Sequence, residues 1–140
     1  MKWRSPLLLS ILVAGTFSCS KNREIKFTDE IVLSNDLIGK WSIVSFTDSG
    51  IDKTAQLSSL SLQFNSSGDF HIFNNDSIVD GDWTILPQIG LDLLKVTVSN
   101  SKAPYMEFQA SWYVYNQTTS TINLSNSSPS RSQVLQLKRI

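Results

Sequence analysis

The chain has 140 residues, in which 12 lysines and arginines are balanced by 12 aspartates and glutamates, and it contains one cysteine. This length corresponds to a single domain of modest size. The balanced charge, without a basic cluster, argues against a nucleic-acid partner. One cysteine excludes a disulfide within the chain.

The first eighteen residues have the order of a secretory signal peptide. Lys2 and Arg4 form a positively charged start, an apolar run of roughly ten residues follows, and the small residue Ser18 closes the segment. The run is too short for a transmembrane helix, which takes about 20 residues. We therefore predict a signal helix over residues 1–18, cleaved before Cys19.

Cys19 at the end of this segment resembles the lipobox cysteine of bacterial lipoproteins. The resemblance implies that the thiol carries a diacylglycerol and anchors the protein to a membrane, with residues 19–36 as a flexible tether. The alternative is a secreted protein with a free thiol. Lys21 and Arg23 stand where some surface lipoproteins of Bacteroidetes carry acidic residues. We therefore expect an outer-membrane lipoprotein that faces the periplasm.

From residue 37 onward, apolar and polar residues alternate with a period of two, which is typical of β-strands with one buried face. We predict about eight strands, around residues 41–46, 60–64, 70–72, 83–85, 94–98, 106–114, 122–124 and 134–137. Turn-rich segments such as residues 65–68 separate them. No amphipathic helix is predicted in this part of the chain.

Eight strands in simple succession favour an all-β fold, an antiparallel up-and-down barrel over residues 37–140. Closing the sheet removes its exposed edges. At about eight strands the interior holds side chains or one small ligand. A sandwich of two sheets is the alternative architecture.

The start of this domain resembles the lipocalins. A Gly-x-Trp stands there in that family, and a basic side chain from the last strand covers the tryptophan; Lys138 and Arg139 are the candidates for this role here. The chain further resembles the lipocalin-like lipoproteins of Bacteroidetes in the motifs Leu37-Ile-Gly39-Lys-Trp41, Leu62-Gln-Phe64, Gly68-Asp-Phe70 and Gly81-Asp-Trp83. We expect the glycines to make room beside the bulky indoles.

Six large aromatic residues are candidates for either core packing or the lining of a ligand cavity: Trp41, Phe64, Phe70, Trp83, Phe108 and Trp112. Two functions follow. The first is a membrane-anchored protein that binds a small lipophilic ligand inside the barrel. The second is a structural or partner-binding protein whose barrel is filled by its own side chains, with Tyr105, Tyr113 and Tyr115 as an exposed contact row.

The sequence contains no convincing catalytic, metal or cofactor motif, so we expect no enzyme. His71 is the only histidine, and its apolar neighbours Phe70 and Ile72 imply that it points away from the core. Asp76, Asp80 and Asp82 are interpreted as solvated turn residues. Asp76-Ser77-Ile78 resembles the O-glycan acceptor of exported Bacteroidetes proteins, which makes Ser77 a candidate modification site.

Overall fold

A computed structural model describes residues 35–86, 88, 90–128 and 131–140 of the chain. The predicted signal peptide, Cys19 and residues 20–34 of the predicted tether lie outside the described residues. The predictions made for them stay predictions.

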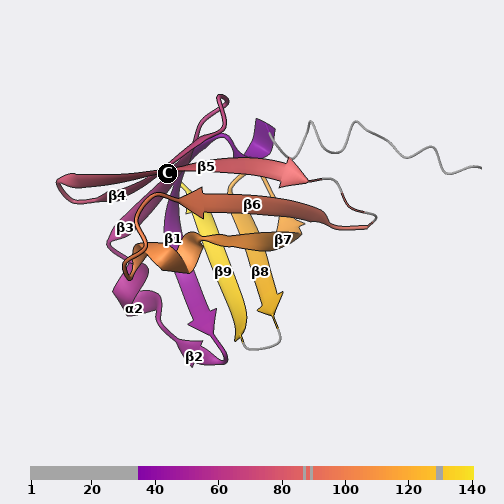
Figure 1. The fold of residues 1–140 in the computed structure, drawn as a ribbon. Helices are drawn as coiled ribbons and strands as arrows, with labels where there is room; N and C mark the ends of the chain where they lie inside the picture. Colours follow the sequence, from indigo (N-terminus) through magenta and orange to yellow (C-terminus); the bar gives the residue numbers. More distant parts are fainter. Residues whose placement is uncertain (1–34, 87, 89, 129–130) are drawn as a thin grey trace, which may run out of the picture.

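The described chain forms nine strands that follow one another along the sequence (Figure 1). They are β1 (Gly39–Asp48), β2 (Ile51–Asp52), β3 (Leu60–Phe64), β4 (Asp69–Asn74), β5 (Ser77–Leu86), β6 (Asp92–Val98), β7 (Ala110–Gln117), β8 (Thr121–Ser128) and β9 (Arg131–Arg139). Neighbouring strands pair antiparallel in the order β2-β1-β3-β4-β5-β6-β7-β8-β9.

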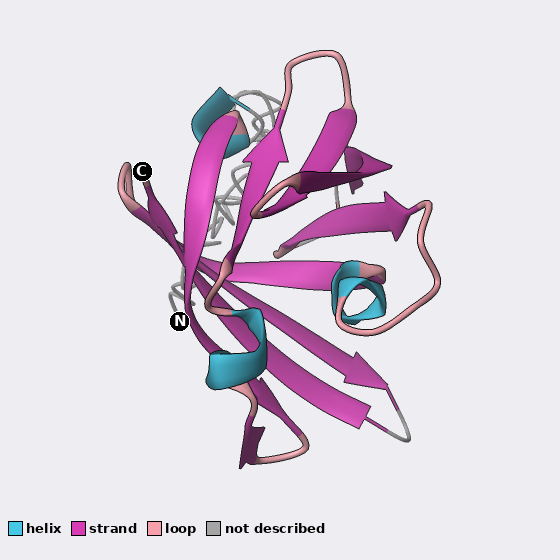
Figure 2. Ribbon diagram, turned by 90° about the vertical axis from the view of Figure 1, so that its left-hand side faces the viewer, coloured by secondary structure: helices cyan, strands magenta, loops and turns pink. Residues whose placement is uncertain are grey.

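The sheet is closed because β1 also pairs antiparallel with β9, and the two strands lie side by side in Figure 1. Figure 2 shows the same strands and helices from a second side. This pairing runs from Trp41 opposite Arg139 to Asp48 opposite Gln133. The two-residue β2 only extends the end of β1 as a short hairpin arm. The other eight strands form the closed up-and-down barrel predicted from the sequence, and the sandwich alternative is wrong.

Three short helical segments accompany the strands. Residues 35–37 are helical directly before β1, α2 (Thr54–Leu57) lies between β2 and β3, and the 3₁₀ helix η1 (Tyr105–Phe108) lies between β6 and β7. Among the described residues, no helix is long and apolar enough to cross a bilayer.

The strand predicted over residues 106–114 begins only at Ala110, so its first part was predicted wrongly. Met106 and Phe108 are two residues apart, as are neighbours on one face of a strand. The backbone of this segment, however, makes hydrogen bonds to residues close in sequence. The N–H of Met106 donates to the carbonyl of Lys102, and the N–H of Gln109 donates to that of Met106, both at 3.2 Å. One turn of 3₁₀ helix and a short strand cannot be told apart by periodicity alone.

The alternation of strands defines two ends of the barrel (Figure 1). At the tether end, residue 35 leads back toward Cys19, and β5, β7 and β9 finish there. At the far end, β1 finishes and β9 begins, and both α2 and η1 lie there.

Alternate side chains of each strand point into the barrel. In β1 the alternation shifts by one residue partway along the strand. Trp41 and Ile43 are buried, and after an irregularity between Ile43 and Ser45 the buried residues are Phe46 and Asp48. Such a bulge inserts one extra residue and turns the following side chains to the other face. The bulge therefore brings an aspartate to the inner wall at the far end.

The two glycines of the Gly-x-Trp motifs make room for groups other than the indoles. A Cβ on Gly81 would lie 2.1 Å from the carbonyl oxygen of Thr97 on β6, and a Cβ on Gly39 would lie 2.5 Å from Nη1 of Arg139. Gly39 also has a φ of +136°, which L side chains rarely adopt. The tryptophans are therefore not the groups that require these glycines. Gly81 is required by the close approach of the β6 backbone, and Gly39 by the guanidinium of Arg139.

Arg139 closes the tether end over Trp41. Its guanidinium carbon lies 4.4 Å from the centre of the fully buried Trp41 ring. The same guanidinium donates to the carbonyls of Thr119 (2.9 Å), Ile38 (2.8 Å) and Asp36. Of the two candidates from the sequence, Arg139 takes this role, while Lys138 is exposed on the outer face.

Replacing Arg139 by lysine is expected to lower the free energy of unfolding by about 1–3 kcal/mol. A lysine keeps the charge but cannot donate from a planar fork to three carbonyls while it stacks on an indole. Urea denaturation followed by tryptophan fluorescence measures the effect. Lys138→Arg is the matched control and should change the free energy by less than about 0.5 kcal/mol. Equal stability of Arg139→Lys and the wild type would contradict the role assigned to the fork.

Candidate functional site

All six aromatic residues singled out from the sequence lie in one hydrophobic cluster inside the barrel. Trp41, Phe64, Phe70, Phe108 and Trp112 are at most 2% exposed, and Trp83 is 9% exposed. The Phe64 ring lies 4.9 Å from that of Phe70 and 5.6 Å from that of Trp83, centre to centre. Phe46, which was not singled out, is also fully buried in this cluster.

Each of these tryptophans places its indole N–H on a backbone carbonyl. Trp41 donates to Leu37 (2.8 Å), Trp83 to Asn65 (2.9 Å) and Trp112 to Phe108 (3.1 Å). The acceptors all lie in segments that lead into or out of strands. A buried indole thereby satisfies its one donor and fixes the adjoining segment against the barrel.

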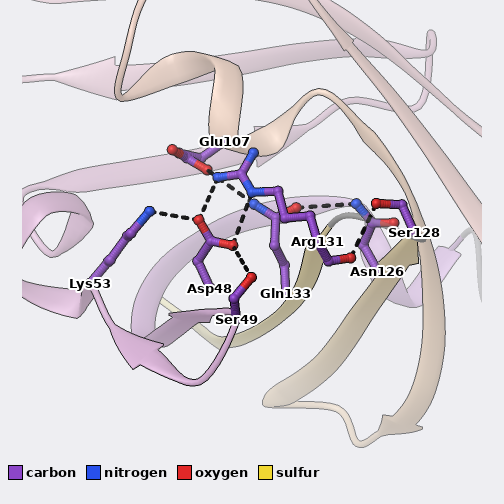
Figure 3. A network of polar contacts seen from close by, with 8 residues as sticks. All are labelled: Asp48, Ser49, Lys53, Glu107, Asn126, Ser128, Arg131 and Gln133. Atoms are coloured by element: carbon purple, nitrogen blue, oxygen red, sulfur yellow. Dashed lines mark hydrogen bonds and ion pairs between the residues drawn. The ribbon is translucent and has the colours of Figure 1, made fainter.

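A network of charged side chains lies at the far end, where the inner wall of the barrel would otherwise be apolar (Figure 3). It contains Asp48 from β1, Lys53 from the segment before α2, Glu107 from η1, and Arg131 and Gln133 from β9. Asp48 and Gln133, at 7% and 2% exposure, are the buried polar residues of the described chain.

Arg131 is the centre of this network. Its Nε donates to Oδ1 of Asp48 at 2.9 Å and its Nη2 to Oδ2 at 2.7 Å, which is the two-point geometry typical of strong arginine–carboxylate pairs. Nη2 also contacts Oε2 of Glu107. Lys53 adds a second cation, with Nζ 2.6 Å from Oδ2 of Asp48.

The neutral members complete the hydrogen bonding. The Gln133 side chain donates to Oε2 of Glu107 at 3.0 Å and accepts from the Asn126 amide at 3.1 Å. Among the described residues, no buried side-chain nitrogen or oxygen lacks a hydrogen-bond partner. A fully satisfied network of this kind holds its members in one arrangement.

The electrostatics of the network favour the ionised forms. The hydrogen bonds from Arg131 and Lys53 hold the pKa of Asp48 well below its usual range. The hydrogen bond to Asp48 likewise raises the pKa of Arg131 above its usual value. Two cations face two carboxylates, so the network is charged but balanced, and it is suited to binding the pieces of the far end together.

The network also holds η1 across the far end. Glu107 ties η1 to β9, and the hydroxyl of Tyr105 accepts a hydrogen bond from the Asn74 amide on β4 at 3.0 Å. With η1 held in this way, Phe108, which follows Glu107, is buried in the core. Tyr105 therefore does not share an exposed row with Tyr113 and Tyr115, which lie on β7; that part of the sequence-based expectation is wrong.

A second feature is a hollow on the outer wall of the barrel, over β4, β5 and β6. Its volume is about 520 Å³, and it is lined by Asp69, His71, Asp80, Gly81, Asp82, Thr97, Val98 and Ser99. His71 points outward, as predicted, because its neighbours Phe70 and Ile72 are fully buried. Its Nδ1 lies 2.8 Å from Oδ1 of Asp80.

Asp80 and Asp82 lie within β5, not in a turn as the sequence suggested. The register places Asp80 opposite His71 and Asp82 opposite Asp69. Only Asp76 occupies a turn. The described residues contain no group of three or more histidine, cysteine, aspartate or glutamate side chains that could hold a metal ion.

The two candidate modification sites differ in what the structure says of them. Ser77 is exposed and is the first residue of β5, directly after the turn at Asp76, and its hydroxyl donates to the carbonyl of Asn74 at 3.1 Å. Its glycosylation stays a prediction. Cys19 lies outside the described residues, and its lipidation likewise stays a prediction.

Two solved structures share this fold. One is a DUF4847 family protein from Bacteroides vulgatus, with a TM-score of 0.54, 13% identity, and coverage of 76% of this chain and 96% of the other. The second is a lipocalin-like protein from Bacteroides uniformis, with a TM-score of 0.50, 13% identity, and coverage of 75% and 99%. At this identity the similarity establishes the lipocalin-like barrel alone. No protein-family model and no curated protein matches the chain.

The low pKa of Asp48 predicts a specific acid sensitivity. A carboxylate whose pKa is depressed by folding stabilises the protein at neutral pH, and this contribution is lost as the pH falls below the unfolded value of about 4 toward the folded pKa. We expect the free energy of unfolding of the wild type to fall more steeply between about pH 4 and pH 2 than that of Asp48→Asn.

Denaturant titrations at several pH values measure these slopes. Asp52, whose pKa is also lowered because its carboxylate accepts hydrogen bonds from Thr54, contributes equally to both proteins. Asp76→Asn, in the exposed turn, is the control and should keep the wild-type slope. Parallel pH profiles for Asp48→Asn and the wild type would rule out a stabilising role for the ionised Asp48.

Proposed function

We propose that this chain is a membrane-anchored envelope lipoprotein that acts through the outer surface of a side-chain-filled barrel, by binding a protein partner. The observation that carries this proposal is the number of large side chains buried inside the barrel. Six fully buried aromatic side chains, from Trp41 at the tether end to Phe108 at the far end, share the space inside eight strands. The interior of an eight-stranded barrel is wide enough either for side chains to fill it or for one small ligand, and we infer that the side chains fill it here.

Both ends of the barrel contribute to this filling. Leu37 and Trp41 are buried at the tether end, where Arg139 covers the Trp41 ring, while α2 and η1 contribute the buried Leu57 and Phe108 at the far end. The outer hollow over β4, β5 and β6, in contrast, is open to solvent and carries three carboxylates. A basic segment of a partner protein fits such a surface, because opposite charges steer association and fix orientation.

The sequence supports the membrane anchor. A signal peptide that ends at the only cysteine is the arrangement of a lipoprotein precursor. A single acyl chain gives only marginal membrane binding, and lipoprotein modification supplies more than one. The basic Lys21 and Arg23 after the cysteine support an outer-membrane location on the periplasmic side.

A lipophilic ligand inside the barrel is the second candidate function, and the barrel fold favours it, because an eight-stranded barrel can hold one small ligand. Glu107 and Tyr105 hold η1 by polar contacts to other strands. If those contacts opened, Phe108 could leave the core and free a volume for a ligand. This candidate predicts that ligand binding requires displacement of η1.

The anchor is tested by replacing Cys19 with serine in the full-length chain. The wild type is expected in the membrane fraction after a carbonate wash, and the lipid mass should be found on its N-terminal residue. Cys19→Ser should appear in the soluble periplasmic fraction or as uncleaved precursor. Wild-type protein released by the wash without any lipid mass would refute the anchor.

The occupied interior is tested by native mass spectrometry of the protein extracted from its own membrane. We expect the mass of the lipidated chain without a second small molecule. The variant Phe108→Ala, which opens a space of side-chain size at the far end, is the positive control for detection and should take up an added fatty acid or detergent molecule. A lipophilic molecule retained by the wild type would overturn the filled-barrel proposal in favour of the carrier.

A further inference from the structure

An apolar patch lies on the outer wall of the barrel at the tether end. It consists of the exposed Leu86 on β5, Leu91 directly before β6 and Tyr115 on β7, together with the half-buried Tyr113 on β7 and with Leu93 on β6, which is only 9% exposed. Leu86 pairs with Leu93, and Leu93 pairs with Tyr113, so these three side chains stand in one row across three strands on the outer face. Leu86, Leu91 and Tyr115 are 40%, 47% and 51% exposed.

The patch is the place where the chain leaves toward its proposed lipid. The Gln117 amide, two residues beyond Tyr115, donates to the Asp36 carboxylate at 3.1 Å. Residue 36 therefore lies beside the end of β7, and only residues 20–34 separate the described part from Cys19. Fully extended, the stretch from Cys19 to Asn35 reaches at most about 55 Å. A lipid on Cys19 therefore keeps the barrel within reach of the bilayer, and the chain enters the barrel at the end that carries the patch.

We infer that this patch docks the barrel onto the surface of the anchoring membrane, with Leu86, Leu91 and Tyr115 in the headgroup region. This inference rests on the proposed lipid anchor. Tyrosine is enriched at membrane interfaces because its ring is apolar and its hydroxyl is polar. Tethering makes the contact intramolecular, so that a small apolar area is sufficient.

The charges on the same wall agree with this orientation. The next row toward the far end contains the exposed Lys95, between Thr84 and Ser111, and a lysine there can reach lipid phosphates. The row after that contains Asp82, about 13 Å from Leu86 along the strand. Interfacial contacts penetrate only about 5–10 Å, so the acidic hollow remains in water.

One acidic residue, Asp92, lies between Leu91 and Leu93 of the patch. It is half-buried and interacts with other groups of the protein. Asp36 is likewise held by Gln117. The wall therefore changes from apolar to basic to acidic with increasing distance from the tether.

Site-specific fluorescence on the full lipidated chain tests the docking. Because lipidation blocks Cys19, a single introduced cysteine takes an environment-sensitive NBD label. Leu91→Cys places the label in the patch, and Ile51→Cys places it on β2 at the far end, where Ile51 is an equally apolar and 64% exposed residue. The proteins are reconstituted in vesicles of phosphatidylethanolamine with a minority of phosphatidylglycerol.

We expect the emission at position 91 to shift to shorter wavelength on vesicles and its quenching by iodide to fall, while position 51 keeps the values of water. Protein that floats with the vesicles but shows water-like emission at position 91 would overturn the docking while the anchor stands. Protein that does not float, or a wild type that itself takes the label, would overturn the anchor first. Shielding of position 91 only in native envelopes would assign the patch to a protein instead.

Discussion

The pairing of β1 with β9 brings the first and last strands of the barrel side by side, and the contacts of Arg139 and Arg131 described above depend on it. At the tether end it sets Arg139 over Trp41, and at the far end it sets Arg131 against Asp48. The two arginines are the first and last residues of β9 and lie in the same inward-facing row. One strand thus supplies a cation to each end, and each cation binds groups from segments distant in sequence.

The two ends nevertheless have different properties. Arg139 faces an indole and backbone carbonyls, which cannot lose their hydrogen-bonding capacity with pH. Arg131 faces two carboxylates, one of them on a short helix that covers the barrel. The contacts that close the tether end consequently do not depend on the ionisation of a carboxylate, whereas those at the far end do. This difference is the physical reason to place any opening of the barrel at η1.

Much of the fold could be predicted from the sequence, because alternation with a period of two is a direct consequence of strand geometry. The buried faces of β3 and β4 follow it residue by residue. The 3₁₀ helix was missed because Met106 and Phe108 satisfy the same spacing. The aspartates of β5 were assigned to a turn because aspartate is common in turns, although on an outer strand face it also meets water.

The charged network could not be predicted, since its members meet only after the barrel closes. Asp48 and Arg131 are 83 residues apart in the sequence, and Glu107 joins them from a third segment. One signal was available: Arg131, Gln133, Leu135 and Leu137 share the parity of an inward-facing row. Arg131 and Gln133 at the start of this row predict that one end of the barrel is polar. They do not predict that Asp48 and Glu107 are their partners.

The bulge in β1 has a consequence for how this chain is compared with its structural neighbours. Before Val44 the inward residues have odd numbers, and after it they have even numbers. An alignment that runs through this point without a gap will equate inner-wall residues of one protein with outer-wall residues of a relative that lacks the bulge. At 13% identity, the amino-acid sequences alone do not reveal this one-residue offset. Phe46 and Asp48 would then be scored as surface positions, and the most informative part of the barrel wall would look unrelated.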